Sequence, residues 1–210
     1  MIGLIACEES QEVTKAFRER EHEFYSNDLI ESSGGHPEWH CQMNCFEAIG
    51  RMGHFDFLGM HPVCRLLANS GVRWLASVNP KKGFEWSVEY HIYINWERYA
   101  EMKEAALFFI KCLEAVKKVG KGYIENPVMH KYAMEIIGVR QSQVIQPWQH
   151  GHGEKKATCL WLVNLPLLQP SDIVQGREQR IWKMPPSKDR AKLRSKTYPG
   201  IAKAMAEQWG

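Results

Sequence analysis

Short apolar segments that end in polar residues alternate along this sequence with segments of helical spacing. Residues 2–5 form an apolar segment that ends at residues 6–10, and Val13, Ala16 and Phe17 then recur at helical spacing. Parallel strands need long crossover connections, which are usually helices. The alternation therefore predicts an α/β protein with a mostly parallel sheet flanked by helices.

Three further strands are predicted, at residues 23–26, at residues 55–60 and from Tyr123 onward. Each ends in polar residues, which are Asp28 after the first, His61 to Cys64 after the second, and Glu125 and Asn126 after the third. Long helices are predicted at about residues 96–118 and 200–209. Because ligands bind at the carboxyl ends of parallel strands, we expect these polar residues to lie at one edge of the sheet.

Length and composition favour one globular domain. A chain of 210 residues that is 44% hydrophobic and 24% charged can form one sizeable core. It has no apolar run of about 18 residues and no basic leader at its first residues, which predicts a cytoplasmic protein without a membrane span. A chain with such a core does not need disulfides, so its six cysteines are predicted to be reduced thiols.

Two segments depart from the α/β pattern. Residues 76–95 interleave basic and aromatic side chains and are predicted to be a loop or lid, which either stacks on bases or is an ordinary surface loop. Residues 177–203 carry a concentration of positive charge, predicted to follow a phosphate backbone or to form a solvated tail. The basic residues of this segment are Arg177, Arg180, Lys183, Lys188, Arg190, Lys192, Arg194, Lys196 and Lys203.

Cys64 is the candidate nucleophile, because it directly follows an apolar strand. A thiolate there would be favoured by the start of a helix or by Arg65, although a lone cysteine is more often a core residue. His36, His40, Cys41 and Cys45 could in principle bind zinc instead, but their spacing fits no common zinc motif. We therefore predict no metal site.

Several segments together resemble the cytosine-5 DNA methyltransferases. Residues 61–71, His-Pro-Val-Cys-Arg-Leu-Leu-Ala-Asn-Ser-Gly, resemble the Pro-Pro-Cys loop of that family, with Val63 in place of the second proline. Residues 124–128, Ile-Glu-Asn-Pro-Val, resemble its Glu-Asn-Val motif. Residues 2–10 look like its first cofactor loop, and residues 194–205 are similar to its last motif. The resemblance covers nearly the whole chain and is nearest to short phage- and prophage-type proteins of a bacterial or phage-infected cell.

The resemblance implies a Rossmann-like methyltransferase fold, with residues 1–210 forming a single S-adenosylmethionine-dependent domain. It implies methylation of carbon 5 of cytosine in DNA, with Cys64 as the nucleophile and Glu125 as the acid at the ring nitrogen. Asn126 would fix the loop, and Lys156 would steady Glu125 or a phosphate. A target base inside a duplex must be flipped out or offered single-stranded.

The resemblance also implies which residues bind S-adenosylmethionine. Asp28, at a strand end, would accept the ribose hydroxyls, and acidic residues of the first loop would suit the cationic sulfonium and ammonium groups. The full set is Ala6, Cys7, Glu8, Glu9, Ser10, Asp28, Asn44, His61, Pro62, Tyr198 and Gly200.

Two alternatives remain open. The first loop lacks a glycine-rich run, and Asn44 stands where an acid contacting adenine is expected, so the chain could bind nucleic acid without catalysis. The family places its target-recognition domain between Thr158 and Arg177, where this chain has only a short segment. RNA or a free nucleotide, which need no such domain, are therefore alternative substrates.

Overall fold

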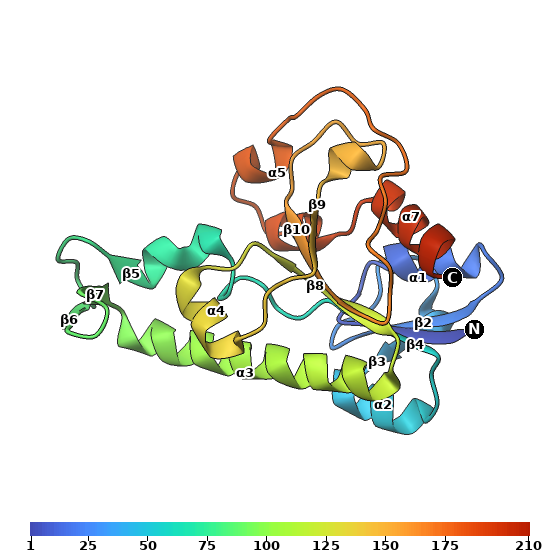
Figure 1. Cartoon of the computed structure of the whole chain (residues 1–210), viewed down its shortest axis with the longest axis horizontal. Helices are drawn as coiled ribbons and strands as arrows, with labels where there is room; N and C mark the ends of the chain where they lie inside the picture. The colour runs from blue at the N-terminus through green and yellow to red at the C-terminus, as the bar shows by residue number, and fades with distance from the viewer.

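The computed structural model describes all 210 residues (Figure 1). Its elements, in chain order, are β1 Ile2–Ala6, α1 Glu12–Arg18, β2 Glu23–Asp28, the 3-10 helix η1 Pro37–Trp39, β3 His40–Gln42, α2 Cys45–Met52, β4 Phe57–Met60, η2 Asn69–Trp74, β5 Ala76–Ser77, β6 Glu85–Ser87, β7 Ile92–Ile94, α3 Trp96–Val119, β8 Gly122–Pro127, α4 Lys131–Ile137, β9 Gln143–Ile145, η3 Pro147–Gln149, β10 Thr158–Val163, α5 Arg180–Lys183, α6 Arg190–Ser195 and α7 Pro199–Trp209. None of the helices is both long and apolar enough to cross a membrane.

Seven strands form the main sheet, in the order β3-β2-β1-β4-β8-β10-β9. The first five run parallel to one another, whereas β10 is antiparallel to both β8 and β9. The prediction of a mostly parallel sheet flanked by helices is therefore confirmed. Because β2, β1, β4 and β8 are neighbours, their carboxyl ends lie side by side.

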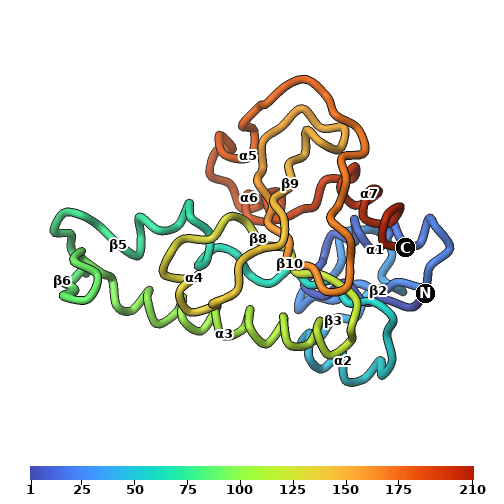
Figure 2. Tube along the Cα trace, viewed as in Figure 1, coloured from blue at the N-terminus to red at the C-terminus, as the bar shows by residue number.

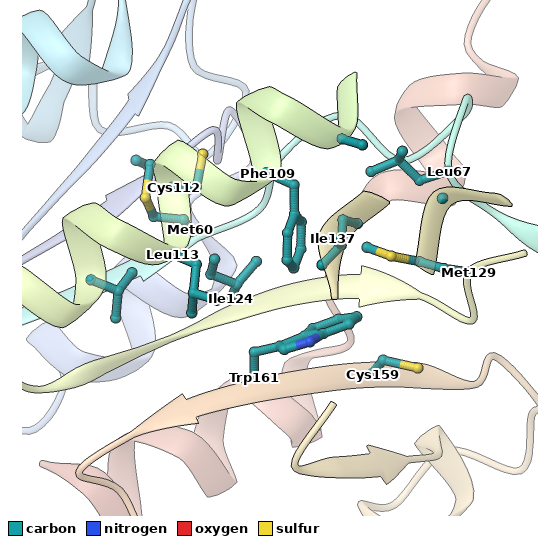
Figure 3. Packing of buried hydrophobic residues seen from close by; sticks show 14 of the residues in the cluster. Met60, Leu67, Phe109, Cys112, Leu113, Ile124, Met129, Ile137, Cys159 and Trp161 are labelled. Carbon is teal, nitrogen blue, oxygen red and sulfur yellow. The ribbon is translucent and has the colours of Figure 1, made fainter. Parts of the chain in front are cut away.

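Helices cover both faces of this sheet and create two buried clusters. Successive strand side chains point to opposite faces, so Leu4 packs on the side of α2, α3 and α4, whereas Ile5 packs on the side of α1 and α7. In the first cluster, Phe109 of α3 lies edge-on to Trp161 of β10, with ring centroids 4.8 Å apart (Figure 3). The sheet is thus the middle of three layers.

Helix α3 is the longest element and agrees with its sequence pattern. Asn95 caps its first turn by accepting a hydrogen bond from the Arg98 amide at 2.9 Å. The helix ends at Gly120, which has the left-handed φ of 94° that glycine adopts without strain. The prediction of a helix over about residues 96–118 is confirmed to within one residue.

Some predicted boundaries were wrong. The strand predicted at residues 55–60 begins only at Phe57. Asp56 contacts Ile2 of β1 just before it, donating its amide to the Ile2 carbonyl at 2.9 Å and accepting the Ile2 amide on its carboxylate at 2.7 Å. Strand β2, in contrast, ends at Asp28 as predicted. Residues 76–95, predicted as a loop, contain the small second sheet β5-β7-β6. The six cysteines form no disulfide.

Two parts of the chain extend away from the main sheet and its helices. The second sheet projects from one end of α3, and the segment that holds β9, α5 and α6 lies above β8 and β10 in the view of Figure 2. Both chain ends lie together at the opposite end of the molecule (Figure 1). Lys121 joins them by donating to the Trp209 carbonyl at 2.9 Å.

Candidate active site

The predicted reactive residues lie at the adjoining ends of β1, β4 and β8. The amide of His61 donates to the carbonyl of Ala6 at 2.9 Å, which ties the segment after β4 to the end of β1. The same segment is tied to β8, because the side-chain Nδ2 atom of Asn126 donates to the Pro62 carbonyl at 3.0 Å. The chain between Pro62 and Cys64 is therefore held between two strands.

Asn126 has the geometry of a residue that fixes this loop. Its side chain is only 1% exposed, and its Oδ1 atom has no hydrogen-bond partner within the protein. A buried acceptor without a partner is uncommon and often marks a functional site. After Cys64 the chain turns back, since the Ala68 amide donates to the Cys64 carbonyl at 2.8 Å. His130, at the start of α4, contacts the Leu66 carbonyl at 2.9 Å and supports this turn.

The Cys64 thiol lies among charged side chains from three separate regions. Burial raises its pKa, the nearby Lys156 ammonium lowers it, Glu125 raises it, and Arg194 lowers it. Burial dominates, so the pKa is raised and the free protein holds a neutral thiol. The two cations would stabilise a thiolate as it formed.

Glu125 projects from β8 beside His61 and Thr197. Its Oε2 atom accepts a hydrogen bond from the Thr197 hydroxyl at 3.3 Å and lies 3.9 Å from His61 Nε2. The same Nε2 shares a 2.8 Å hydrogen bond with the Tyr123 hydroxyl. Burial lowers the pKa of His61, so this ring is neutral at physiological pH. Thr197 was missed by the sequence analysis, because a threonine in a basic segment gives no sign that it meets a distant strand.

Lys156 lies between Glu125 and the C-terminal segment. Burial lowers its pKa, while the charges of Glu125 and Cys64 raise it. Its Nζ atom donates to the Lys196 carbonyl at 3.0 Å and lies 5.7 Å from the ring centre of Tyr198. The structure thus brings together three of the four predicted catalytic side chains, with Asn126 fixing the loop beside them.

The loop after β1 adopts conformations that usually require glycine. Cys7 and Gln11 have φ values of 60° and 56°, in the left-handed region that L residues rarely occupy. Gln11 holds the loop by donating from Nε2 to Ser26 Oγ at 3.0 Å and to the His36 carbonyl at 2.8 Å. Although the sequence lacks a glycine-rich run, the backbone turns as such a run would.

The Glu8 side chain has a structural role that the sequence analysis did not find. Its carboxylate accepts hydrogen bonds from the Val13 amide at 2.6 Å, the Thr14 amide at 3.2 Å and the Thr14 hydroxyl at 2.7 Å. These bonds satisfy free amides at the start of α1. Burial outweighs them and raises the pKa of Glu8 to about 7. The Glu8 amide also donates to the Asn27 carbonyl at 2.8 Å, and the residue is buried, so the predicted contact of its carboxylate with the cofactor is wrong.

Asp28, at the end of β2, keeps one carboxylate oxygen without a protein partner. Its Oδ1 atom accepts the amides of Leu29 at 2.7 Å and Ile30 at 3.4 Å, and its Oδ2 atom makes no hydrogen bond to protein. Leu29 and Ile30 are both exposed. A free carboxylate oxygen beside apolar side chains suits a ribose that carries a flat base. Asp28 was predicted from the sequence, whereas Leu29 and Ile30 were not.

Other predicted cofactor residues have partners elsewhere in the protein. Asn44 caps α2 by accepting the Phe46 amide at 2.9 Å. The Tyr198 hydroxyl donates to Glu154 at 2.6 Å, and the Gly200 amide donates to His152 Nε2 at 3.0 Å. Ser10 is buried. These contacts fix α2 and the start of α7.

Several charges of the basic segment are paired within the protein. Lys192 lies 3.6 Å from Glu9, and Lys196 lies 2.8 Å from Glu12, so α6 is tied to the loop after β1. Arg180 contacts Glu154 at 2.9 Å. The predicted tail of free cations is therefore wrong for these three residues, because acidic side chains from distant parts of the sequence meet them.

The residues considered for zinc do not form a metal site. No three His, Cys, Asp or Glu side chains of the chain are grouped so that they could hold a metal ion. His40 instead contacts Ser26 Oγ at 2.8 Å, His36 stacks on Trp39, and Cys41 lies 3.8 Å from the Met52 sulfur.

No protein-family model and no curated protein matches the sequence. Among solved structures, a methyltransferase of Entamoeba histolytica, EhMeth, is similar with a TM-score of 0.51 and 12% identity, over 85% of this chain and 57% of its own. A protein encoded within an E. coli prophage and described as a DNA modification methyltransferase gives a TM-score of 0.48 at 8% identity, over 89% of this chain and 56% of its own. A triple mutant of Spodoptera frugiperda DNMT2 gives 0.42 at 13% identity, over 85% and 54%.

The chain spans just over half the length of these structures. At such low identity the similarity concerns the fold alone, and the Entamoeba histolytica protein provides the support for it. Together with the strand order and the helices on both faces, this similarity shows that the protein has the α/β, Rossmann-like methyltransferase fold.

Proposed function

We propose that the protein is an S-adenosylmethionine-dependent methyltransferase that methylates carbon 5 of cytosine in DNA through a covalent adduct with Cys64. The observation that carries this proposal is the grouping of Cys64, Glu125 and Lys156 at the adjoining ends of β4 and β8. These three side chains supply a nucleophile, an acid and a cation to one place in a methyltransferase fold.

The chemistry begins with the weak nucleophilicity of carbon 5 of cytosine. Addition of the Cys64 thiolate to carbon 6 forms a carbon–sulfur bond and moves electron density onto carbon 5 and the ring nitrogen. Glu125 donates a proton to that nitrogen, which lowers the barrier. Carbon 5 then takes the methyl group as the methyl–sulfonium bond breaks. Removal of the carbon-5 proton by a base breaks the carbon–sulfur bond, releases Cys64 as a thiolate and returns the ring-nitrogen proton to Glu125.

The neighbours of these two residues have positioning and electrostatic roles. Lys156 and Arg194 oppose the effect of burial on the Cys64 pKa and so favour the thiolate when the site closes on a base. Thr197 orients Glu125 through its hydrogen bond. Asn126 donates a hydrogen bond to the carbonyl of Pro62 and thereby fixes the position of the loop that carries Cys64.

The residues at the ends of β1 and β2 fit the cofactor. S-adenosylmethionine supplies the electrophilic methyl group when it is bound. The free Oδ2 atom of Asp28 would accept a ribose hydroxyl, and Leu29 and Ile30 would cover the adenine. The turn at Cys7 presents main-chain groups of the first loop toward the methionine part.

Transfer of a tritiated methyl group tests this function. We expect label to enter single-stranded or duplex DNA of mixed sequence with the wild-type protein and with Cys41→Ser, but not with Cys64→Ser. Calorimetry should show that all three proteins bind S-adenosylmethionine equally. Label that enters only RNA or only a free nucleotide would show that this molecule, and not DNA, is the substrate. Cofactor binding without transfer to any of them would overturn the enzymatic proposal.

A further inference from the structure

The second sheet forms an arm, defined as residues 73–94, that stands apart from the main sheet (Figure 1). Its base is anchored, since Leu75 and Ile94 are buried and the Tyr90 hydroxyl lies 3.0 Å from that of Tyr99 on α3. Tyr90 also lies edge-on to Tyr132 of α4. The arm is therefore a fixed part of the fold with an exposed outer part.

One face of the arm presents aromatic side chains to solvent. Ser77 and Trp86 both pair with Tyr93, so the three side chains share one face of the small sheet. Trp86 is 52% exposed and lies edge-on to Tyr93, with ring centroids 5.2 Å apart. Trp74, at the base of the arm, is 51% exposed. Exposed indoles of this size commonly mark a binding surface.

Cations lie over two rings of the arm, Trp74 and Phe84, and none lies over Trp86 or Tyr93. The Lys81 ammonium is 4.8 Å from the Trp74 ring centre and 4.9 Å from that of Phe84, and the Arg73 guanidinium is 5.2 Å from Trp74. Lys82 beside them is exposed and has no acidic partner. Aromatic platforms flanked by cations are typical of proteins that bind single-stranded nucleic acid.

The charge of the arm argues against a duplex as its ligand. Glu85 and Glu89 nearly balance Arg73, Lys81 and Lys82. Binding of a duplex depends mainly on neutralising many phosphates, and this arm cannot do so. An unpaired base, in contrast, offers a free face on which an indole can stack.

We propose that the arm binds single-stranded DNA, with Trp86 and Trp74 stacking on its bases. The choice of DNA rests on the proposed function. In the chain the arm follows the Cys64 segment through η2. A second copy of the chain is the other candidate for this aromatic face, but the cations over Trp74 and Phe84 favour an anionic ligand.

Fluorescence anisotropy with a labelled single-stranded oligodeoxynucleotide, measured without cofactor, tests the proposal. We expect Trp86→Ala to weaken binding about tenfold or more, and Trp86→Phe to restore part of the loss. Lys82→Ala should reduce the slope of log affinity against log salt by about 0.7. The matched controls on the exposed side of α3, Leu107→Ala and Lys103→Ala, should leave binding unchanged.

Three results would overturn the proposal. They are unchanged affinity of Trp86→Ala, equal affinity of the wild type for duplex DNA or for RNA of the same sequence, and a dimer that dissociates on Trp86→Ala in light scattering. The binding measurement contains no cofactor and so does not depend on methyl transfer. Failure of methyl transfer would therefore leave the binding result intact, and failure of arm binding would leave methyl transfer to be judged separately.

Discussion

The Cys64 thiol lies where burial and nearby charges shift its pKa in opposite directions. Burial favours the neutral thiol, whereas Lys156 and Arg194 favour the thiolate. Because burial dominates, the proposed nucleophile is masked in the free protein, which limits side reactions of an accessible thiolate. Under the proposed function, arrival of a base that completes the site decides when Cys64 reacts.

The rate of Cys64 alkylation reports how burial and the nearby cations together set the pKa of the thiol. We expect its rate with iodoacetamide, followed by peptide mass spectrometry, to rise with pH without a plateau below about pH 9, because only the thiolate reacts. Lys156→Ala should slow the reaction at pH 8 by about three- to tenfold, since one pKa unit changes the thiolate fraction about tenfold. Lys155→Ala is the matched control and should react as the wild type does. A plateau below pH 8 would contradict the raised pKa.

Glu8 makes stability depend on pH in the direction opposite to an ordinary paired carboxylate. Its pKa is raised from 4.5 to about 7 by burial, so the folded state holds a proton that the unfolded chain has released between these values. Stability contributed by this group is full below pH 4.5 and is lost as pH rises toward 7. Denaturant unfolding at several pH values should show this loss, on the order of 3 kcal/mol. Glu8→Gln should flatten the profile, and Glu114→Gln, on the exposed surface of α3, should not.

At the residue level, the sequence predicts reactive positions better than supporting ones. Cys64 follows β4, Glu125 and Asn126 lie in the last part of β8, and the parallel pairing of the two strands brings their motifs together. The roles of Glu8 and Thr197 depend on where α1 begins and on how the C-terminal segment folds back. Neither can be read from local sequence patterns.

Strands β4 and β8 approach each other closely at one glycine. A Cβ atom on Gly122 would lie 1.9 Å from the Leu58 carbonyl oxygen, so no larger residue fits without moving the strands that carry the site. In contrast, a Cβ on Gly50 of α2 would meet nothing within 4 Å. These two glycines offer a matched pair for testing the sheet.

We expect Gly122→Ala to lower the free energy of unfolding by about 1–3 kcal/mol or more, because overpacking shifts the backbone. Gly50→Ala should instead raise it by up to about 1 kcal/mol, because alanine favours the helix. Chemical denaturation measures both. Equal effects of the two substitutions would contradict the described pairing of β4 with β8.

At the level of elements, long periodic segments were predicted and short ones were not. Helix α3 and strand β1 match their patterns because each has enough residues to show a period. Strand β10 was missed although Thr158–Val163 is a continuous apolar run typical of a buried strand. The arm strands have only two or three residues each, too few for a pattern.

At the scale of the whole molecule, two segments flank the candidate site: the arm and the C-terminal segment. The arm leaves the Cys64 segment on one side, and the C-terminal segment returns on the other, where Lys192 and Lys196 pair with Glu9 and Glu12. The net charge of +3 therefore says little about binding, because it does not show which cations pair with acidic side chains of the protein. Such pairings between distant segments could not be predicted from the sequence.

The covalent role of Cys64 is tested most directly with an oligodeoxynucleotide that contains 5-fluorocytosine. Fluorine at carbon 5 cannot leave as a proton does, so the adduct with the thiolate should persist after methylation. With S-adenosylmethionine present, we predict a denaturation-resistant complex, linked at Cys64 by mass spectrometry, for the wild type and Cys41→Ser but not for Cys64→Ser. A protein that binds both cofactor and oligonucleotide yet forms no complex, or a complex linked at another residue, would contradict this account.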